Sequence, residues 1–299
     1  MKKVLVICGP TASGKSDLAI ECAKLLNSEI ISADSMNVYA RLNIGTAKPT
    51  IEDQRLIKHH MIDVVQPTDS FSVGDYRDLA LPIVNNLVES GKIPVICGGT
   101  GFYINSLLYK MSYGNGCANY ELREELKKLV QEKGNQEVYK ILQEKDPESA
   151  KVLHPNDLKR VIRALEIFYN GTKKSEIKDD KTPIFDYSAY SFDYSTEALY
   201  DRINLRVDKM VNYGLIDEVK SLLSEGVLPS YQCMQGIGYK EVIPYLENII
   251  DLQTCIDTIK LNTRHYAKRQ KTFFKKLPNL QYLIPNDNKL LVKLVVDKL

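Results

Sequence analysis

Short apolar runs alternate with amphipathic segments over the first 110 residues. Four of the runs have the length of a buried strand, and we expect strands at 4–8, 29–33, 61–65 and 93–97. Between and after them, apolar side chains recur on one helical face, and we expect helices at 15–26, 73–90 and 101–110. Short buried strands joined by helices predict a parallel sheet with right-handed crossovers.

The strand pattern stops at about residue 112 and returns at about residue 187. In the intervening block we expect three helices, each heavily charged on one face, at 121–133, 135–145 and 156–169. Loose joints at the two ends of the block are marked by Gly114, Gly116, Gly171 and the lysine-rich run 173–181. Beyond the block we expect a strand at 187–192 and helices at 197–212, 215–224 and 252–276. The pattern predicts an α/β fold, with a parallel-sheet core and helices on both faces over 1–111 and 187–299, and a small all-helical insertion domain over 112–186.

The net charge is close to zero, but it is unevenly distributed. The 299 residues include 40 Lys and Arg against 38 Asp and Glu, and 44% are hydrophobic. This composition is ordinary for a globular protein and excludes a disordered or collagen-like chain. Residues 260–276 hold seven Lys and Arg and no acid, which leaves the rest of the chain at −5. Near-neutrality therefore does not exclude a nucleic-acid partner.

The six cysteines are scattered, with no CxxC pair and no histidines at ligand spacing. This argues against a zinc site and a disulfide framework, and it favours a reducing cytosol. Only five apolar residues lie between Lys3 and Gly9, too few for a signal peptide or a membrane span. We therefore expect a cytoplasmic protein with no membrane partner.

Residues 9–16 match the phosphate-binding pattern G-x-x-x-x-G-K-(S/T), directly after an expected strand and at the start of an expected helix. The glycines let backbone amides curve round a phosphate, and the helix N-terminus adds a favourable dipole. The structural alternative is a glycine-containing turn before a helix. The lysine supplies positive charge, and the Ser16 hydroxyl suits a metal ion, Mg²⁺. The sequence predicts a phosphate site formed by Gly9, Pro10, Thr11, Ala12, Ser13, Gly14, Lys15 and Ser16.

A phosphate-binding loop (P-loop) does not by itself define the reaction. Nucleoside triphosphatases add a strand-end carboxylate for the metal, but the expected strand 93–97 is followed by GGTG at 98–101. The nearest strand-end carboxylate is Asp34. In a parallel sheet, the strand ends that carry the P-loop, Asp34 and Thr100 lie at one edge. From these residues alone, Asp34 is a metal ligand, a base acting on an acceptor, or a helix cap.

Ten sequence blocks extend in order over nearly the whole chain. The first five are GPTASGKS at 9–16, DSMNVY at 34–39, IGTAKP at 44–49, HHMID at 59–63 and GGTGFYINSLL at 98–108. The others are HPNDLKRVIRALEIF at 154–168, RINLRVDKM at 202–210, GLIDEV at 214–219, QGIGYKE at 235–241 and TRHYAKRQKTFFKK at 263–276. Together they resemble the tRNA dimethylallyltransferases, also called isopentenyltransferases, of the bacterial type.

The resemblance implies transfer of a dimethylallyl group from dimethylallyl diphosphate to N6 of adenosine-37, next to the anticodon in tRNA. It also explains why no strand-end acid follows 93–97, since the P-loop would hold an allylic diphosphate and would not hydrolyse ATP. The loop amides, Lys15, Ser16 and, by the family's motif, Arg206 would stabilise the leaving diphosphate. Asp34 matches the family's base for the N6 proton, and Thr100 matches its residue for positioning the reacting groups.

Structural roles compete with several of these assignments. Arg206 could form a salt bridge with Asp208 or Asp217, and Thr100 could cap the helix that follows it. The histidine pair 59–60 is expected to be structural, because no third ligand lies at metal spacing.

The basic segment 260–276 interleaves cations with aromatic side chains. Bases unstacked from an RNA loop are read by stacking and base-edge contacts, with Lys and Arg on the backbone. A solvated amphipathic helix is the structural alternative. Asn37 and Phe273 depart from the family pattern, in which Gln and Trp are common. By the resemblance, the contacts to the tRNA anticodon stem-loop come from Asp34, Ser35, Met36, Asn37, Thr46, Lys48, Thr100, Arg123, Asp157, Leu158, Lys159, Arg160, Val161, Arg264, Lys268, Arg269 and Lys271.

We expect the chain to act as a monomer on tRNA and dimethylallyl diphosphate, with Mg²⁺. A P-loop nucleotide or small-molecule kinase is the alternative enzyme, and it predicts a lid with several phosphate-facing arginines. Residues 112–186 hold only Arg123, Arg160 and Arg163. A non-catalytic RNA-binding protein with a relic P-loop would require an impaired loop or a missing Asp34, and neither is seen.

Overall fold

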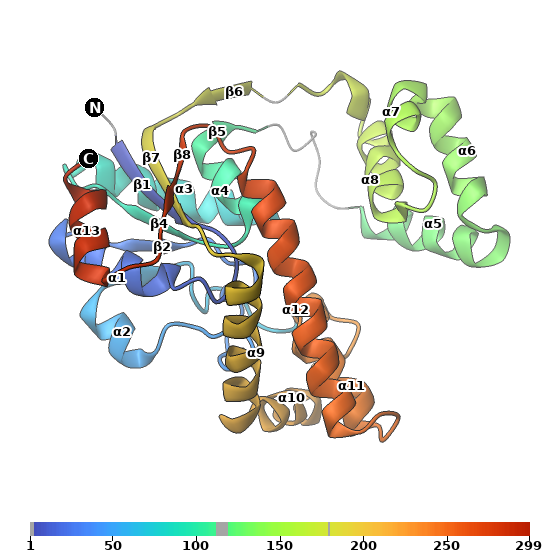
Figure 1. Ribbon diagram of the computed structural model, residues 1–299. Helices are drawn as coiled ribbons and strands as arrows, with labels where there is room; N and C mark the ends of the chain where they lie inside the picture. Colours follow the sequence, from blue (N-terminus) through green and yellow to red (C-terminus); the bar gives the residue numbers. More distant parts are fainter. Residues whose placement is uncertain (1–2, 112–118, 179) are drawn as a thin grey trace. The chain divides into compact units, whose positions relative to one another are not determined.

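The computed structural model describes residues 3–111, 119–178 and 180–299. The chain divides into two compact units, one made of Met1–Leu108 with Pro183–Leu299 and the other of Tyr109–Thr182 (Figure 1). The sequence pattern put the corresponding boundaries at 112 and 186. The expected boundary at 112 and the joint at Gly114 and Gly116 lie outside the described residues.

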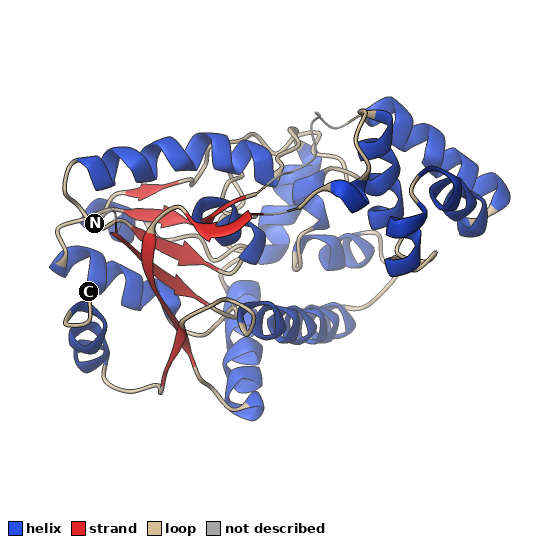
Figure 2. Ribbon diagram, turned by 90° about the horizontal axis from the view of Figure 1, so that it is seen from above, coloured by secondary structure: helices blue, strands red, loops and turns tan. Residues whose placement is uncertain are grey.

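A six-stranded sheet forms the centre of the larger unit (Figure 2). The strands follow the order β3-β2-β4-β1-β7-β8, and every pair of neighbours is parallel. Their bounds are β1 (Lys3–Cys8), β2 (Ile30–Ser32), β3 (His59–His60), β4 (Val95–Gly98), β7 (Asp186–Phe192) and β8 (Leu280–Leu283). The predicted fold class is therefore confirmed.

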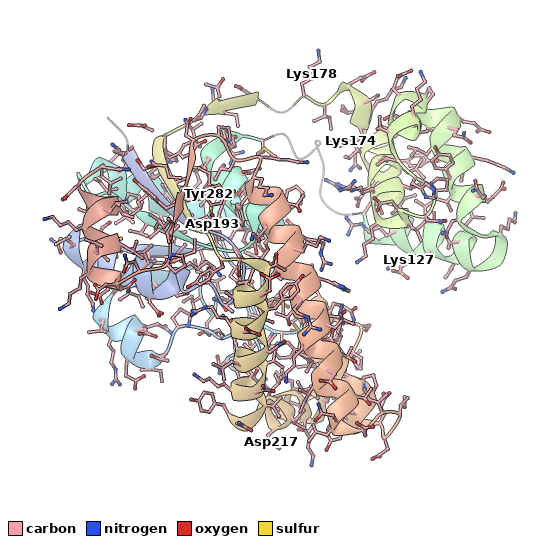
Figure 3. All side chains as sticks on the ribbon, viewed as in Figure 1. Lys127, Lys174, Lys178, Asp193, Asp217 and Tyr282 are labelled. Carbon is pink, nitrogen blue, oxygen red and sulfur yellow. The ribbon has the colours of Figure 1, made fainter. Side chains whose placement is uncertain are left out.

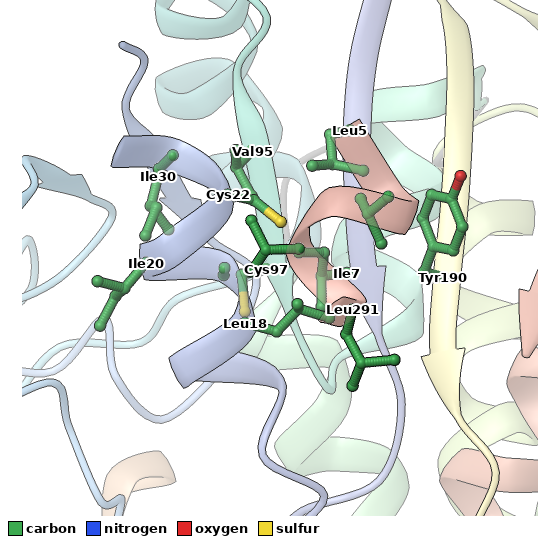
Figure 4. Packing of buried hydrophobic residues seen from close by; sticks show 14 of the residues in the cluster. Leu5, Ile7, Leu18, Ile20, Cys22, Ile30, Val95, Cys97, Tyr190 and Leu291 are labelled. Carbon is green, nitrogen blue, oxygen red and sulfur yellow. The ribbon is translucent and has the colours of Figure 1, made fainter. Parts of the chain in front are cut away.

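Helices cover both faces of this sheet. On one face, Leu5 and Ile7 of β1 are fully buried against α1 (Lys15–Leu25) and α13 (Asn288–Val296) (Figure 4). Burying an aliphatic side chain of this size contributes about 1.5–3 kcal/mol. The other face is covered by α3 (Val73–Glu89) and α4 (Gly101–Leu108). There the rings of Tyr76 and Tyr103 stack with centroids 3.9 Å apart, and the Tyr76 hydroxyl donates to the Ser32 carbonyl at 3.0 Å.

Further helices of the larger unit extend beyond the sheet. The longest, α12 (Leu252–Phe274), packs along α9 (Thr196–Asn212) (Figure 1). The other elements are α2 (Ile51–Leu56), α10 (Leu215–Ser224), the 3₁₀ helix η2 (Gln232–Gln235) and α11 (Tyr239–Leu246). Both long helices contribute residues to the pocket described below.

The strand expected at 61–65 is wrong. The strand lies earlier, at His59–His60, and Met61 and Asp63 have φ angles of 62° and 55°. Left-handed backbone of this kind turns the chain and cannot continue a strand. Only an isolated bridge between Tyr39 and Val65 remains of the expected pairing there.

The smaller unit has a helical core. Its elements are α5 (Tyr120–Lys133), α6 (Asn135–Lys145), α7 (Pro147–Val152), α8 (Leu158–Tyr169) and the 3₁₀ helix η1 (Lys174–Glu176). A short strand pair, β5 (Tyr109–Lys110) and β6 (Asp180–Pro183), forms where the chain enters and leaves the unit. The exposed side chains of Lys127, Lys174 and Lys178 extend from its surface (Figure 3).

Within the described residues, no helix is long and apolar enough to span a membrane.

Candidate active site

The P-loop joins β1 to α1 in a shape that suits an anion. Gly14 has a φ of 88°, a left-handed conformation that glycine adopts without strain, and it stands immediately before α1. No side chain among the described residues caps this helix, so its first N–H groups are left to a ligand. Within the loop, the Ser13 hydroxyl is buried without a hydrogen-bond partner in the described structure. A phosphate oxygen would satisfy such groups.

Lys15 lies at the base of the P-loop. Its Nζ donates to the Pro10 carbonyl at 3.2 Å. Burial lowers the pKa of Lys15, and the Arg206 guanidinium lowers it further, whereas the Asp34 carboxylate raises it. A bound diphosphate would favour the charged ammonium, because a nearby opposite charge stabilises the ionised form.

Three strand ends bring the expected catalytic groups to one edge of the sheet. The P-loop follows β1, Asp34 follows β2 and Thr100 follows β4, and these strands are neighbours in the order β2-β4-β1. Asp34 Oδ1 accepts the Met36 N–H at 2.9 Å, so this carboxylate closes a turn and does not cap a helix. Thr100 Oγ1 accepts the Ser35 N–H at 3.0 Å, which ties the Thr100 loop to the Asp34 loop.

Arg206 reaches the same site from α9. Its Nη2 donates to the Thr46 carbonyl at 3.4 Å. Burial lowers the pKa of Arg206, while the Asp34 carboxylate raises it. The alternative pairing with Asp208 competes with a second one: Asp208, one of the two alternative partners of Arg206, pairs with Lys260 Nζ at 2.6 Å.

A pocket of about 360 Å³ connects these groups within the larger unit. Lys15, Ser16, Asp34 and Arg206 all line it. Apolar side chains form another part of its wall, and these are Ile30, Met36, Ile203, Val207, Met210, Ile237 and Ile259. The pocket therefore combines an anion site and a carboxylate with an apolar surface.

The two adjacent histidines make structural contacts. His60 Nε2 and Glu29 Oε2 are 2.7 Å apart, and His59 Nδ1 lies 2.7 Å from the Ile57 carbonyl. Burial lowers the pKa of His59. Among the described residues, no cluster of three or more His, Cys, Asp or Glu side chains is arranged to hold a metal ion.

The basic residues of α12 differ in their surroundings. Lys268 and Arg269 are exposed, and the Arg269 guanidinium lies 5.6 Å from the centre of the Tyr266 ring. Arg264 donates to Asn204 Oδ1 at 2.8 Å, and Lys271 Nζ donates to the Tyr194 carbonyl at 3.0 Å. Lys268 and Arg269 are therefore accessible to a large anion, whereas Arg264 and Lys271 are hydrogen-bonded within the protein.

Two expected tRNA contacts near the pocket point inward. The Lys48 side chain is 4% exposed and pairs with Asp63 at 2.5 Å and the Tyr39 carbonyl at 2.8 Å. The Thr46 hydroxyl donates a hydrogen bond to the Leu42 carbonyl at 2.8 Å. Both side chains therefore shape the loop 43–48.

In the smaller unit, the expected contacts fall into two groups. Val161 is fully buried and Leu158 packs against the same helical core, so both are packing residues there. Lys159 and Arg160 are exposed, and Asp157 lies 3.4 Å from Arg160 Nε.

Arg123 has a structural partner in the same unit. Its Nη2 donates at 2.9 Å to Glu166 Oε2, and Arg163 Nη1 donates to the same oxygen at 2.6 Å. Glu166 is fully buried, and these arginines with the Asn119 N–H hold its pKa below the ordinary value although burial raises it. A buried carboxylate without its cations would strongly destabilise the fold. Arg123 therefore stabilises the smaller unit, in addition to any contact with tRNA.

The sequence pattern did not single out several residues that support the site, although most stand inside the quoted blocks. Gln270 and Tyr266 lie in TRHYAKRQKTFFKK, Glu218 in GLIDEV and Tyr239 in QGIGYKE. Arg202, in RINLRVDKM, donates from Nε to the Ala12 carbonyl of the P-loop at 2.7 Å. The blocks contain these residues, but their contacts to distant backbone groups appear only in the folded chain.

A parallel sheet with a P-loop at its carboxyl edge, and a pocket that combines this loop with a carboxylate and an apolar wall, is the architecture of a P-loop enzyme. The model of the IPP transferase family matches residues 37–277. The chain belongs to this family.

Relatives with known names match this chain over most of their length. The tRNA dimethylallyltransferase of Alkaliphilus oremlandii is 46% identical over 284 residues, covering 94% of this chain and 91% of the relative. The crystal structure of the tRNA isopentenylpyrophosphate transferase of Bacillus halodurans is 39% identical, with a TM-score of 0.74 and coverage of 100% of this chain and 96% of that one. A eukaryotic dimethylallyltransferase captured acting on tRNA is 31% identical with a TM-score of 0.82, covering 97% and 75% of the two chains.

Proposed function

We propose that the protein transfers the dimethylallyl group of dimethylallyl diphosphate to N6 of adenosine-37, next to the anticodon of tRNA. The observation that carries the proposal is the pocket in which Lys15 and Arg206 share a wall with Asp34 and an apolar surface, in a chain of the IPP transferase family. tRNA dimethylallyltransferase is the name of its relatives.

The diphosphate would lie in the P-loop. Cleavage of the allylic C–O bond leaves the electron pair on the diphosphate, so negative charge grows there in the transition state. The amides at the start of α1, Lys15, Ser16 and Arg206 supply fixed positive potential at that position. The five-carbon chain is apolar, and the aliphatic part of the pocket wall suits it.

Asp34 would act as the base. The new bond joins N6 of the adenine to the allylic carbon, and the N6 proton must leave as the amine becomes alkylated. A positioned carboxylate that accepts this proton contributes about 10²–10⁴-fold in rate. Thr100 holds the Asp34 loop through the Ser35 N–H and so acts as a positioning residue. The Asn37 amide oxygen lies on the same wall, buried without a partner among the described residues, and would accept an N–H of the base.

The donor set at the P-loop fits a hard cation such as Mg²⁺. Ser16 lines the pocket beside Asp34, and Mg²⁺ prefers oxygen ligands, keeps several waters and commonly binds through substrate phosphates. Ser16 would hold the ion together with the diphosphate, and the ion would neutralise charge on the leaving group. The shortage of protein ligands in the described structure is compatible with this mode.

The tRNA anticodon stem-loop would contact exposed cations of both units. In the larger unit these are Lys268 and Arg269, next to the pocket edge that Arg269 itself lines. In the smaller unit they are Lys159 and Arg160. We infer that the enzyme acts as a monomer, and its proposed substrate, tRNA, supports a cytoplasmic location.

The test is a transfer assay with radiolabelled dimethylallyl diphosphate and unmodified tRNA, with the product nucleoside identified by mass spectrometry. We expect label in N6-dimethylallyladenosine at position 37. The parallel assay supplies ATP and small acceptors in place of these substrates. Phosphorylation there without prenyl transfer would replace the proposal by the kinase alternative.

Asp34→Asn sharpens the same test. The asparagine oxygen can still accept the Met36 N–H, so the turn is retained while the base is lost. We expect kcat to fall by about 10²-fold or more with tRNA affinity nearly unchanged, because the base acts in the transition state. A defect confined to tRNA binding would refute the assignment of the base.

A further inference from the structure

One buried side chain bridges two loops of the pocket. Gln270 of α12 is 5% exposed. Its Oε1 accepts the Thr11 N–H of the P-loop at 3.0 Å, and its Nε2 donates to the Gly99 carbonyl at 2.9 Å. Gly99 immediately precedes Thr100. The amide of Gln270 thus joins the phosphate side of the site to the side that holds Asp34.

The Gly99 backbone packs closely against the Gln270 amide. A Cβ atom at Gly99 would lie 2.2 Å from Gln270 Nε2, so the loop approaches the amide as closely as glycine permits. The Tyr266 side chain, one turn earlier on α12, lines the same pocket as Gln270. The bridge through Gln270 therefore joins the P-loop to the Thr100 loop beside the pocket.

Glutamine is the residue type that this bridge requires. The Thr11 N–H needs an acceptor and the Gly99 carbonyl needs a donor, and a primary amide offers both on one planar group. An ionised glutamate has the same shape but presents an acceptor to the Gly99 carbonyl. A protonated glutamate restores a donor at that position.

The distance between the two loops matters for the reaction. The P-loop would hold the leaving diphosphate, and the Asp34 and Thr100 loops would hold the attacking amine and its base. The reacting carbon must lie in line between them, and a misplacement of about 1 Å can cost about 10²-fold in rate.

We propose that Gln270 is a positioning residue that fixes the P-loop relative to the Thr100 loop, so that the diphosphate and the acceptor amine are held in line for transfer. This rests on the proposed function. Gln270 itself would touch neither the proton nor the leaving group.

The experiment compares Gln270→Leu and Gln270→Glu with the unaltered enzyme. Gln253→Leu is the matched control, because Gln253 lies on the same helix, is exposed and bonds only locally to Asp257 at 3.1 Å. For Gln270→Leu we expect kcat to fall by about 10²-fold, with the KM values for both substrates and the Kd for inorganic pyrophosphate within about threefold of the unaltered enzyme. Gln253→Leu should retain full activity.

Gln270→Glu supplies a readout that a merely structural role would not move. The ratio of its kcat to that of the unaltered enzyme should rise as the pH falls, because protonation restores the donor toward the Gly99 carbonyl. Gln270→Leu should show a ratio independent of pH. Thermal unfolding of each variant shows that the compared proteins are folded, and the isosteric Gln270→Glu serves if the leucine variant does not fold.

Two results would overturn the inference. One is a kcat within threefold of the unaltered enzyme for Gln270→Leu, and the other is a flat pH ratio for Gln270→Glu. If the unaltered enzyme itself transfers no prenyl group to tRNA, the proposed function fails first, and the two failures are thereby distinguished.

Discussion

The carboxylate of Glu218 holds one wall of the pocket through backbone groups. It accepts three successive N–H groups, from Asn43, Ile44 and Gly45, at 2.9, 2.8 and 3.1 Å. The Tyr239 hydroxyl donates to it as well, at 2.6 Å. These contacts fix the start of the loop 43–48, whose Thr46 carbonyl in turn accepts from Arg206.

The structure gives the size of the effect expected when this carboxylate is altered. A hydrogen bond to a charged group contributes about 1.5–3 kcal/mol. Glu218→Gln replaces one acceptor oxygen by an NH₂ group that opposes the backbone donors, so at least one such bond is lost. We expect the free energy of unfolding to fall by about 2–3 kcal/mol, and Tyr239→Phe to lower it by about 1–2 kcal/mol.

Thermal unfolding followed by circular dichroism measures the change. In a unit of roughly 200 residues, each kcal/mol lowers Tm by about 2–4 °C, so Glu218→Gln should lower it by about 4–12 °C. The double variant should lose less than the sum of the two single variants, because both alter the Glu218–Tyr239 pair. The matched control is Asp217→Asn, the exposed neighbour on the same helix (Figure 3). A Glu218→Gln protein with the same Tm as the Asp217→Asn control would refute the reasoning.

Three further predictions concern the anion site, the basic helix and an ion cluster at the sheet edge. Lys15→Ala should weaken pyrophosphate binding and turnover together, and unchanged values in calorimetry and in the transfer assay would contradict the P-loop assignment. Charge reversal by Lys268→Glu with Arg269→Glu should weaken the binding of all tRNAs about equally. It should also flatten the dependence of log Kd on the logarithm of the salt concentration. An unaltered salt slope would make that face of α12 a solvated surface. Although burial raises it, hydrogen bonds from His60 and Lys92 lower the pKa of Glu29 to about 2, below its ordinary 4.5. The lowered pKa adds about 1–2 kcal/mol to the free energy of unfolding after solvent screening. This contribution should be complete above pH 5 and lost between pH 4.5 and 2. Denaturant titrations of Glu29→Gln should lack that part of the acid dependence.

The elements that could be predicted from the sequence are those with a continuous pattern of burial. β1 and β4 are apolar runs because helices cover both faces of the sheet, and their shared edge follows from parallel pairing. β8 was missed because it is an edge strand whose middle residues, Gln281 and Tyr282, are exposed. β3 consists of two histidines, residue types that carry no strand pattern.

The site could be predicted only as far as residue chemistry reveals it. Lys15 and Asp34 carry charges that the proposed reaction needs. The P-loop pattern identified Lys15, and the strand-end position identified Asp34. Gln270 and Glu218 bond to backbone groups 171 and more residues away, and a backbone N–H or carbonyl leaves no trace in the residue type that carries it. Lys48 was expected to contact tRNA from the resemblance alone, and the burial of its ammonium against Asp63 could not be predicted from the residue type.

Side chains from α9 and α12 hold the backbone of the P-loop. The Thr11 N–H is bonded to Gln270, the Ala12 carbonyl accepts from Arg202, and the N-terminus of α1 points its amides at the site. Dipoles fixed in advance stabilise charge without reorganisation at the moment of reaction. Lys15 is different, because its ammonium donates to the Pro10 carbonyl and can exchange that bond for one to phosphate. Because its backbone groups are bonded to side chains of α9 and α12, the loop gains rigidity from these two helices. The same helices carry Arg206 and the exposed cations Lys268 and Arg269. In the proposed reaction, the same pair of helices would position the diphosphate and present the charges that meet tRNA, so one packed surface would serve both substrates.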